Sequence, residues 1–293
     1  MRAPGAQMIV GKTECAGFLS GGCIERDVEL HARKTILDGV PRHLVYGHGS
    51  PWIDTRLPCG GRIDILVERL TANCTHAQRL ASSADSRDLH RWVSDGRVPR
   101  LEQLPGTQMQ ASARLLEGGP RIEVIYSPRT RLVVVGWDPM ALALASVATM
   151  VGLETCLARP CGPSEPPPIP GVRYLRGGVD EISGTCDSWS AIALMTHDLE
   201  LEDELLARIL PGQAFYVGAL GSARRRPERL RRLAVRGVST SDAERLRSPI
   251  GLPLGASAPL EIASSIVSDV IKASKSQPRM ATSKHLAVAS KDS

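Results

Sequence analysis

Arg131-Leu132-Val133-Val134-Val135-Gly136 is the stretch that decides the fold of this 293-residue chain. Its apolar residues follow one another without polar alternation, which is typical of a parallel strand buried on both faces. Three more apolar runs follow, at 153–158, 191–195 and 214–218. Helical periodicity follows the strands, at 139–151, 201–210, 224–236 and 259–272. Strands that alternate with helices predict a Rossmann-like, doubly wound parallel sheet over residues 128–275.

The chain before this sheet has a different pattern. Short strand-like runs and one helical run predict a small N-terminal α/β domain over residues 1–70. A connecting region, 71–127, follows, with a predicted helix at 75–93 and two strands, at 108–116 and 120–126. The last residues, 276–293, are rich in Ser, Lys and Ala and predict a disordered tail. The fold class is therefore α/β, with two domains.

Composition limits the possible functions. The chain is 42% apolar and 23% charged, as in globular proteins, and it has no apolar run long enough for a membrane span. Aromatic residues make up only 3%, which argues against nucleic-acid binding by base stacking. The seven cysteines form no C-x-x-C pair, and the N-terminus lacks a secretory signal, so we expect free thiols in a reducing cytoplasm.

Two cysteines stand beside glycine pairs. In Ser20-Gly21-Gly22-Cys23-Ile24-Glu25, Cys23 comes at the predicted start of a helix that Gly39 would end. Free amides there would attract an anion or activate the thiol, although a small buried cysteine fits the same pattern. Cys59-Gly60-Gly61 precedes a predicted strand at 62–68. The two loops either converge on one site or resemble each other by chance.

The first turn of the predicted Rossmann-like sheet departs from a dinucleotide fingerprint. Gly136-Trp137-Asp138-Pro139-Met140-Ala141 has only the first glycine of G-x-G-x-x-G, and Asp138 predicts a helix cap. After the second strand, Ala158-Arg159-Pro160 stands where an acidic residue is expected. Both features argue against NAD binding.

Two further loops follow strands at the carboxyl edge, where ligands bind in this fold. Thr196-His197-Asp198 could orient a proton or a ligand, or simply cap a helix. Gly218-Ala219-Leu220-Gly221-Ser222-Ala223-Arg224 is a glycine-rich turn before a helix, and it suits an anion. The arginines at 224–226, 229, 231 and 232 then form either a solvated helix face or an anion or partner site.

These motifs together resemble the XdhC/CoxI family of accessory proteins of molybdenum hydroxylases. The resemblance rests on four blocks and extends over nearly the whole chain: Ser20–Glu25, Cys59–Gly61, Met195–Asp198 and Tyr216–Ser222. It implies a protein that binds the molybdenum cofactor, molybdopterin, while its sulfido ligand is installed, and that delivers it to the apo-hydroxylase. The implied partners are the hydroxylase large subunit, a cysteine desulfurase and a second copy of the chain.

The resemblance also assigns roles to residues. Cys23 and Cys59 become the metal ligands or contacts, since soft thiolates match molybdenum–sulfur chemistry. The glycine loops and Arg224 would meet the cofactor's phosphate, and His197 and Asp198 would line a cleft between the domains. The full cofactor-binding set is Gly21, Gly22, Cys23, Glu25, Cys59, Gly60, Gly61, His197, Asp198, Gly218, Gly221, Ser222 and Arg224.

Two turns differ from the family pattern. Family members commonly have Gly-Ala-Gly-His in the first Rossmann turn and Asp-Pro-Arg after the second strand, where this chain has Gly-Trp-Asp-Pro and Ala-Arg-Pro. Roles in those loops are therefore not transferred. Two alternatives stay open: an NAD(P)-dependent oxidoreductase on a degenerate Rossmann domain, and a degraded paralogue that only docks a hydroxylase subunit.

Overall fold

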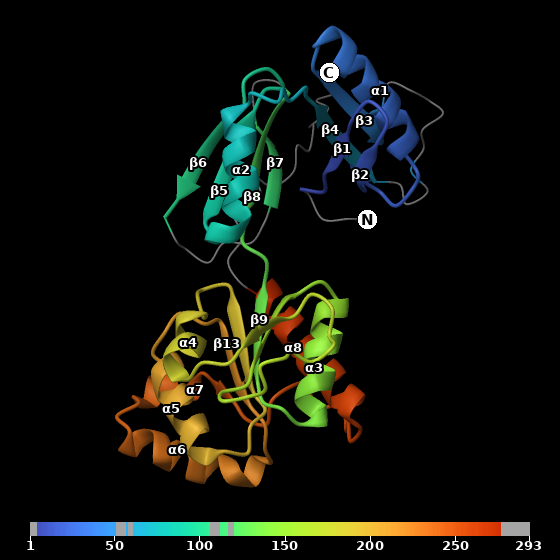
Figure 1. The fold of residues 1–293 in the computed structure, drawn as a ribbon. Coiled ribbons are helices and arrows are strands. Elements are labelled where there is room, and N and C mark those ends of the chain that lie inside the picture. Colours follow the sequence, from blue (N-terminus) through green and yellow to red (C-terminus); the bar gives the residue numbers. More distant parts are fainter. Residues whose placement is uncertain (1–4, 51–56, 58–60, 106–111, 117–119, 277–293) are drawn as a thin grey trace, which may run out of the picture. The chain divides into compact units, whose positions relative to one another are not determined.

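A computed structural model describes residues 5–50, 57, 61–105, 112–116 and 120–276 (Figure 1). The chain divides into two compact units, Met1–Pro128 and Arg129–Gln277. The first unit contains both the predicted N-terminal domain and the segment 71–127. Each unit has its own hydrophobic cores.

Unit 2 is a doubly wound α/β sheet, as predicted. Its parallel strands have the order β11-β10-β9-β12-β13-β14. The strands are β9 (Arg131–Val135), β10 (Glu154–Ala158), β11 (Arg173–Leu175), β12 (Ser190–Leu194), β13 (Tyr216–Ala219) and β14 (Leu246–Arg247). The helices are α3 (Pro139–Met150), α4 (Val179–Gly184), α5 (Leu199–Ile209), α6 (Arg226–Val235), α7 (Thr240–Glu244) and α8 (Pro259–Lys275), with a 3₁₀ turn η1 (Ala223–Arg225) before α6.

Strand β9 is the centre of this unit because both of its faces are buried. Leu132 and Val134 pack towards α3 and α8, whereas Val133 and Val135 pack towards the opposite face, which α4, α5, α6 and α7 cover (Figure 1). None of these four side chains is exposed to solvent. The continuous apolar run therefore reflects two cores that share one strand.

The described residues of unit 1 form short antiparallel sheets and two helices. Strands β1 (Met8–Val10) and β2 (Cys15–Gly17) pair with each other, as do β3 (Arg42–Gly47) and β4 (Arg62–Val67). Helix α1 (Glu25–Asp38) buries Val28 against β3 and β4. Helix α2 (Thr75–Ser86) packs on a four-stranded sheet of order β6-β5-β8-β7. Its strands are β5 (Leu89–Ser94), β6 (Arg100–Leu104), β7 (Ser112–Leu116) and β8 (Arg121–Tyr126).

The helix predicted at 75–93 was wrong in its second half. Helix α2 stops at Ser86, because Arg87 adopts a left-handed conformation with φ of 55°. The following residues then form β5, in which Trp92 is buried. Apolar and aromatic residues favour this strand, but its pattern merges with that of the helix in the sequence.

Candidate functional site

The carboxyl edge of the sheet in unit 2 gathers the loops that the sequence singled out. The strand order changes direction between β9 and β12, so the turns after these two strands lie at the topological switch point. Ligands of doubly wound folds bind at such a point. Gly136 opens the first turn, and a Cβ there would lie 3.0 Å from the carbonyl oxygen of Met195, so glycine allows the two turns to approach closely.

A carboxylate and an imidazole connect these two turns. Asp138 caps α3, accepting a hydrogen bond of 2.8 Å from the amide of Ala141, as the sequence predicted. Its other oxygen lies 3.5 Å from Nε2 of His197, whose side chain is 74% exposed. The structure therefore pairs His197 with Asp138, in the turn after β9, and not with its neighbour in the chain.

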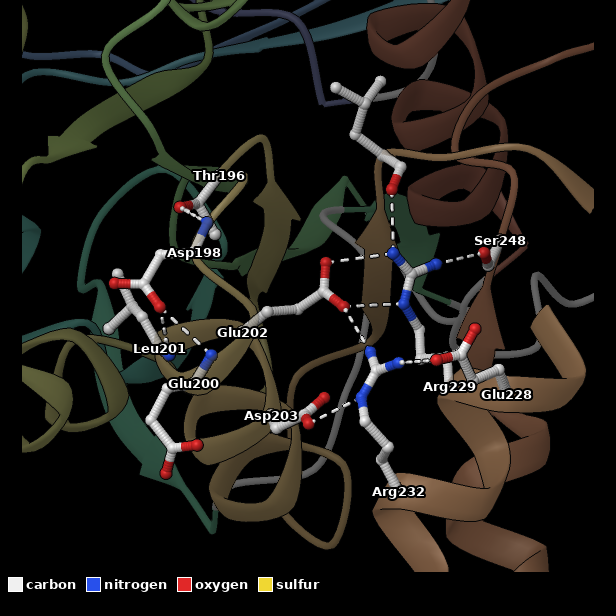
Figure 2. Close-up of polar contacts among 11 residues, drawn as sticks. Thr196, Asp198, Glu200, Leu201, Glu202, Asp203, Glu228, Arg229, Arg232 and Ser248 are labelled. Carbon is white, nitrogen blue, oxygen red and sulfur yellow. Dashed lines mark hydrogen bonds and ion pairs between the residues drawn. The ribbon is translucent and has the colours of Figure 1, made fainter. Parts of the chain in front are cut away.

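Asp198 is a helix cap, which was one of the two interpretations of its motif. Its Oδ1 accepts hydrogen bonds from the amides of Glu200 and Leu201, at 3.0 and 3.2 Å, and so begins α5 (Figure 2). The hydroxyl of Thr196 accepts a hydrogen bond of 3.1 Å from the backbone amide of Asp198. The polar groups of this motif thus shape the turn and start the helix.

The glycines of the next turn make room for other parts of the protein. Gly218 lies inside β13, where a Cβ would come within 2.5 Å of the Ile250 side chain. Gly221 has φ of +143°, and a Cβ there would lie 3.3 Å from a guanidinium nitrogen of Arg229. Ser222 and Arg224, in contrast, are exposed. The glycines therefore have structural reasons to be present, and the exposed polar side chains remain available to a ligand.

A buried arginine, Arg229, connects three segments at this edge. Its guanidinium donates two hydrogen bonds to the carboxylate of Glu202 on α5, at 2.7 and 2.9 Å (Figure 2). It also donates to the Ser248 hydroxyl at 2.6 Å and to the Leu220 carbonyl at 2.9 Å. We call Arg229, Glu202, Leu220 and Ser248 the Arg229 cluster. Both charged members are at most 3% exposed.

Sequence reasoning missed this cluster, because Arg229 stands in a run of arginines and was grouped with them. Its position did contain a signal. Arg229 lies four residues before Leu233, which is buried in the core, so the two share the inner side of α6. Glu202 likewise shares the inner side of α5 with the buried residues Leu205 and Leu206. Two charges at core-facing positions indicate a buried ion pair.

In unit 1, the loop before α1 surrounds a carboxylate of its own. We call Leu19–Glu25 the Glu25 loop. The Glu25 carboxylate accepts hydrogen bonds of 2.7–3.2 Å from the Ser20 hydroxyl and from the backbone amides of Leu19, Ser20, Gly21, Gly22 and Ile24. Burial opposes ionisation of this carboxyl, but the hydrogen bonds outweigh it and hold the pKa of Glu25 well below its ordinary value.

The geometry of this loop corrects one expectation and excludes one alternative. The amides were expected to be free for an external anion, but they already donate to Glu25. Gly21 and Gly22 have φ of +106° and +115°, and only glycine adopts such values readily. Cys23 was weighed as a buried residue, yet it is an exposed free thiol, and its amide donates to the Ser20 hydroxyl at 3.2 Å. The loop therefore presents the thiol to solvent.

The second cysteine motif is mostly beyond the described part of the chain. Cys59 and Gly60 lie outside the described residues, and so does any convergence of Cys59 with Cys23. The carbonyl of Gly61 accepts a hydrogen bond of 3.1 Å from the backbone amide of His48. Among the residues that the structure describes, no group of three or more His, Cys, Asp and Glu side chains could hold a metal ion. Within the same residues, no helix is long and apolar enough to cross a membrane.

Comparison with known proteins gives the family of this chain. Residues 132–270 match the XdhC Rossmann domain, and residues 1–47 match the XdhC and CoxI family. The chain is also 30% identical to the molybdenum cofactor insertion chaperone PaoD of Escherichia coli, over 86% of this chain and 72% of that protein. This chain belongs to the XdhC/CoxI family.

Two further relatives agree with the assignment. A probable xanthine dehydrogenase subunit of Bacillus subtilis is 24% identical, over 94% of this chain and 89% of that protein. A crystal structure of a xanthine dehydrogenase from Bacillus halodurans superposes with a TM-score of 0.71 at 25% identity. It covers 94% of this chain and 88% of that chain. The resemblance read from the motifs and the doubly wound fold class are both confirmed.

Proposed function

We propose that this protein binds the molybdenum cofactor, holds it during sulfuration and inserts it into an apo-hydroxylase of the xanthine dehydrogenase type. The relationship to the insertion chaperone PaoD, over most of both chains, carries this proposal. The names of the Bacillus relatives support xanthine dehydrogenase as the class of client.

Cys23 is the residue of unit 1 that fits the cofactor best. Its thiol is exposed, and the loop that carries it is held by the Glu25 carboxylate. A thiolate is a soft ligand that suits molybdenum–sulfur chemistry, which the cofactor would supply. Cys59 is proposed as the second thiol contact, with Gly60 and Gly61 beside it.

The phosphate of the cofactor needs hydrogen-bond donors that the protein does not already use. Because Glu25 accepts the amides of Gly21 and Gly22, these two glycines are proposed to shape the loop and not to bind phosphate. The exposed Ser222 and Arg224 of unit 2 offer a hydroxyl and a guanidinium instead. Arginine suits phosphate because its planar fork donates two parallel hydrogen bonds.

The assignment is tested by loading the purified protein with molybdenum cofactor and measuring how much it retains. Wild-type protein should retain an equimolar amount and should restore activity to an apo-hydroxylase. Cys23→Ala should retain much less. Cys161→Ala is the matched control, because Cys161 is also an exposed free cysteine but lies in unit 2. Equal retention by Cys23→Ala and wild type would refute the role of Cys23. Lack of retention and of reconstitution by wild type would refute the function.

A further inference from the structure

The arginines of η1 and α6, together with Arg236 at the C-terminal end of α6, fall into two groups. Three of them pair with carboxylates of α5: Arg229 with Glu202, Arg232 with Asp203 at 2.8 Å, and Arg236 with Glu200 at 2.5 Å. They are three and four residues apart, so they form one stripe along the helix that faces α5. Figure 2 shows the first two of these pairs. This group stabilises the packing of unit 2.

The second group, Arg224, Arg225, Arg226 and Arg231, has no carboxylate partner on α5 among the described residues. Arg224 is already proposed to contact the cofactor's phosphate, so we call only Arg225, Arg226 and Arg231 the outer arginine face. Arg226 is half-buried and the other two are exposed. Within the described part of the chain, none of these three side chains has an ion pair or hydrogen bond. Glu228 lies in the same stretch, but its carboxylate is 3.6 Å from Arg232, in the inner group.

This concentration of charge is large for the protein. The whole chain has a net charge of +5, and the outer arginine face, with Arg224 beside it, places four positive charges within 224–231. Like charges so close together repel one another, and three carboxylates of α5, Glu200, Glu202 and Asp203, are already paired with the inner group. Such an arrangement becomes favourable when an external anionic surface lies against it.

Apolar surface accompanies the charge. Val235 is 89% exposed and lies four residues after Arg231, on the same side of α6. Pro227, four residues before Arg231, and Ala234 are exposed as well. Arginine beside exposed apolar side chains is typical of protein–protein interfaces, where arginine is enriched and lysine is depleted.

We propose that the outer arginine face docks an acidic patch on the protein that receives the cofactor. This inference rests on the proposed function, because it assumes that a hydroxylase is the client. The partner is assigned as a protein because the arginines stand beside exposed apolar surface such as Val235, and because the chain has few aromatic residues (3%) on which bases could stack. Val235 would then pack against an apolar residue inside the acidic patch.

The main effect of such a face is on the rate of association. Exposed ion pairs each contribute little to affinity, but complementary charge steers two proteins together and fixes their orientation. We therefore expect association with the apo-hydroxylase to be fast at low salt and to slow steeply as salt screens the charges.

The experiment compares two triple variants with the same change in charge. The test variant carries Arg225→Glu, Arg226→Glu and Arg231→Glu, and it keeps Arg224 because that residue is proposed to contact the phosphate. The control carries Arg173→Glu, Lys272→Glu and Lys275→Glu. These residues are exposed, on β11 at the opposite edge of the sheet and on α8 over its other face. Association rates with the apo-hydroxylase are measured over a series of salt concentrations, and cofactor retention is measured in parallel.

The test variant should associate at least about tenfold more slowly than wild type at low salt and lose most of its salt dependence. It should retain cofactor as wild type does, which shows that it is folded, and the control should associate nearly as fast as wild type. Equal slowing in both variants would overturn the docking face, as would wild-type rates in the test variant. Binding to double-stranded DNA is measured in parallel; if wild type binds DNA and the test variant loses that binding while it still associates with the hydroxylase at the wild-type rate, the docking face is overturned as well. Wild-type protein that does not associate at all would instead overturn the proposed function.

Discussion

The Glu25 loop and the turn at Gly221 begin from the same kind of sequence and have opposite chemistry. Each has glycine with positive φ shortly before a helix. In the Glu25 loop, backbone amides surround a carboxylate. At the turn after β13, a backbone carbonyl accepts from the buried guanidinium of Arg229. A glycine-rich turn before a helix therefore indicates a tightly shaped backbone, and it does not by itself indicate an anion site.

The two regions also differ in how far along the chain their contacts reach. Every hydrogen bond to Glu25 comes from within six residues of it. Arg229 bonds to Glu202, 27 residues before it, and to Ser248, 19 residues after it. The first region is a local structure, and the second connects distant segments. Substitutions in the Arg229 cluster should therefore cost more stability than substitutions in the Glu25 loop.

The largest effect should follow Arg229→Ala. It leaves the buried Glu202 carboxylate without its partner, so we expect the free energy of unfolding to fall by about 3–5 kcal/mol. Chemical denaturation of unit 2, followed by tryptophan fluorescence, measures this change. Arg231→Ala is the matched control, because Arg231 is exposed on the same helix and should change stability by less than about 0.5 kcal/mol. If Arg229→Ala lowered the free energy of unfolding by less than about 1 kcal/mol, the Arg229 cluster would not contribute more to stability than the Glu25 loop.

A smaller effect should follow Glu25→Gln, and it should depend on pH. The neutral amide weakens charge-assisted hydrogen bonds, so stability at neutral pH should fall by about 1.5–3 kcal/mol. Because the pKa of Glu25 is lowered by folding, the unfolded chain binds a proton more readily than the folded one. The contribution of Glu25 is therefore complete above about pH 4.3, the ordinary value, and it declines as pH falls below that.

Chemical denaturation of wild type and Glu25→Gln at neutral and acidic pH tests this prediction. The difference between the two proteins should shrink as the solution is acidified. Asp38, whose pKa is lowered to about 2 by the hydrogen bond from Arg42, titrates in both proteins and so cancels from the difference. A difference that stayed constant with pH would mean that the charge of Glu25 does not hold the loop.

The smallest effect should follow Gly221→Ala. The new methyl group would force an unfavourable φ and would meet a guanidinium nitrogen of Arg229 at 3.3 Å. We expect a loss of about 1–2 kcal/mol, measured by thermal or chemical denaturation. Gly184→Ala is the control, since that glycine has ordinary φ and no atom within 4 Å of an added Cβ. Equal stability of the two variants would show that the Gly221 turn is not constrained by Arg229.

The sequence predicted the features that depend on a local pattern of residues, namely strands and helix ends. The apolar run of β9 indicated a strand with two buried faces, and Asp138 and Gly39 marked helix ends that the structure confirms. The sequence did not predict which side chains form ion pairs with the charged residues near these loops. The partner of Asp138 is His197, from the turn after another strand, and the partner of Arg229 is Glu202, on another helix. Such pairs depend on strand order and helix packing, which residue spacing along one segment does not determine.

The Glu25 loop has one more consequence, which concerns protein engineering. Its hydrogen bonds all come from residues 19–25, and its two glycines meet nothing within 4 Å of where a Cβ would stand. The loop therefore needs little from its surroundings beyond a helix to begin, a pocket for Ile24, which is 3% exposed, and apolar neighbours for Leu19. It is a transplantable unit: grafted onto the first turn of an unrelated helix, it should display a single exposed thiol in a defined position.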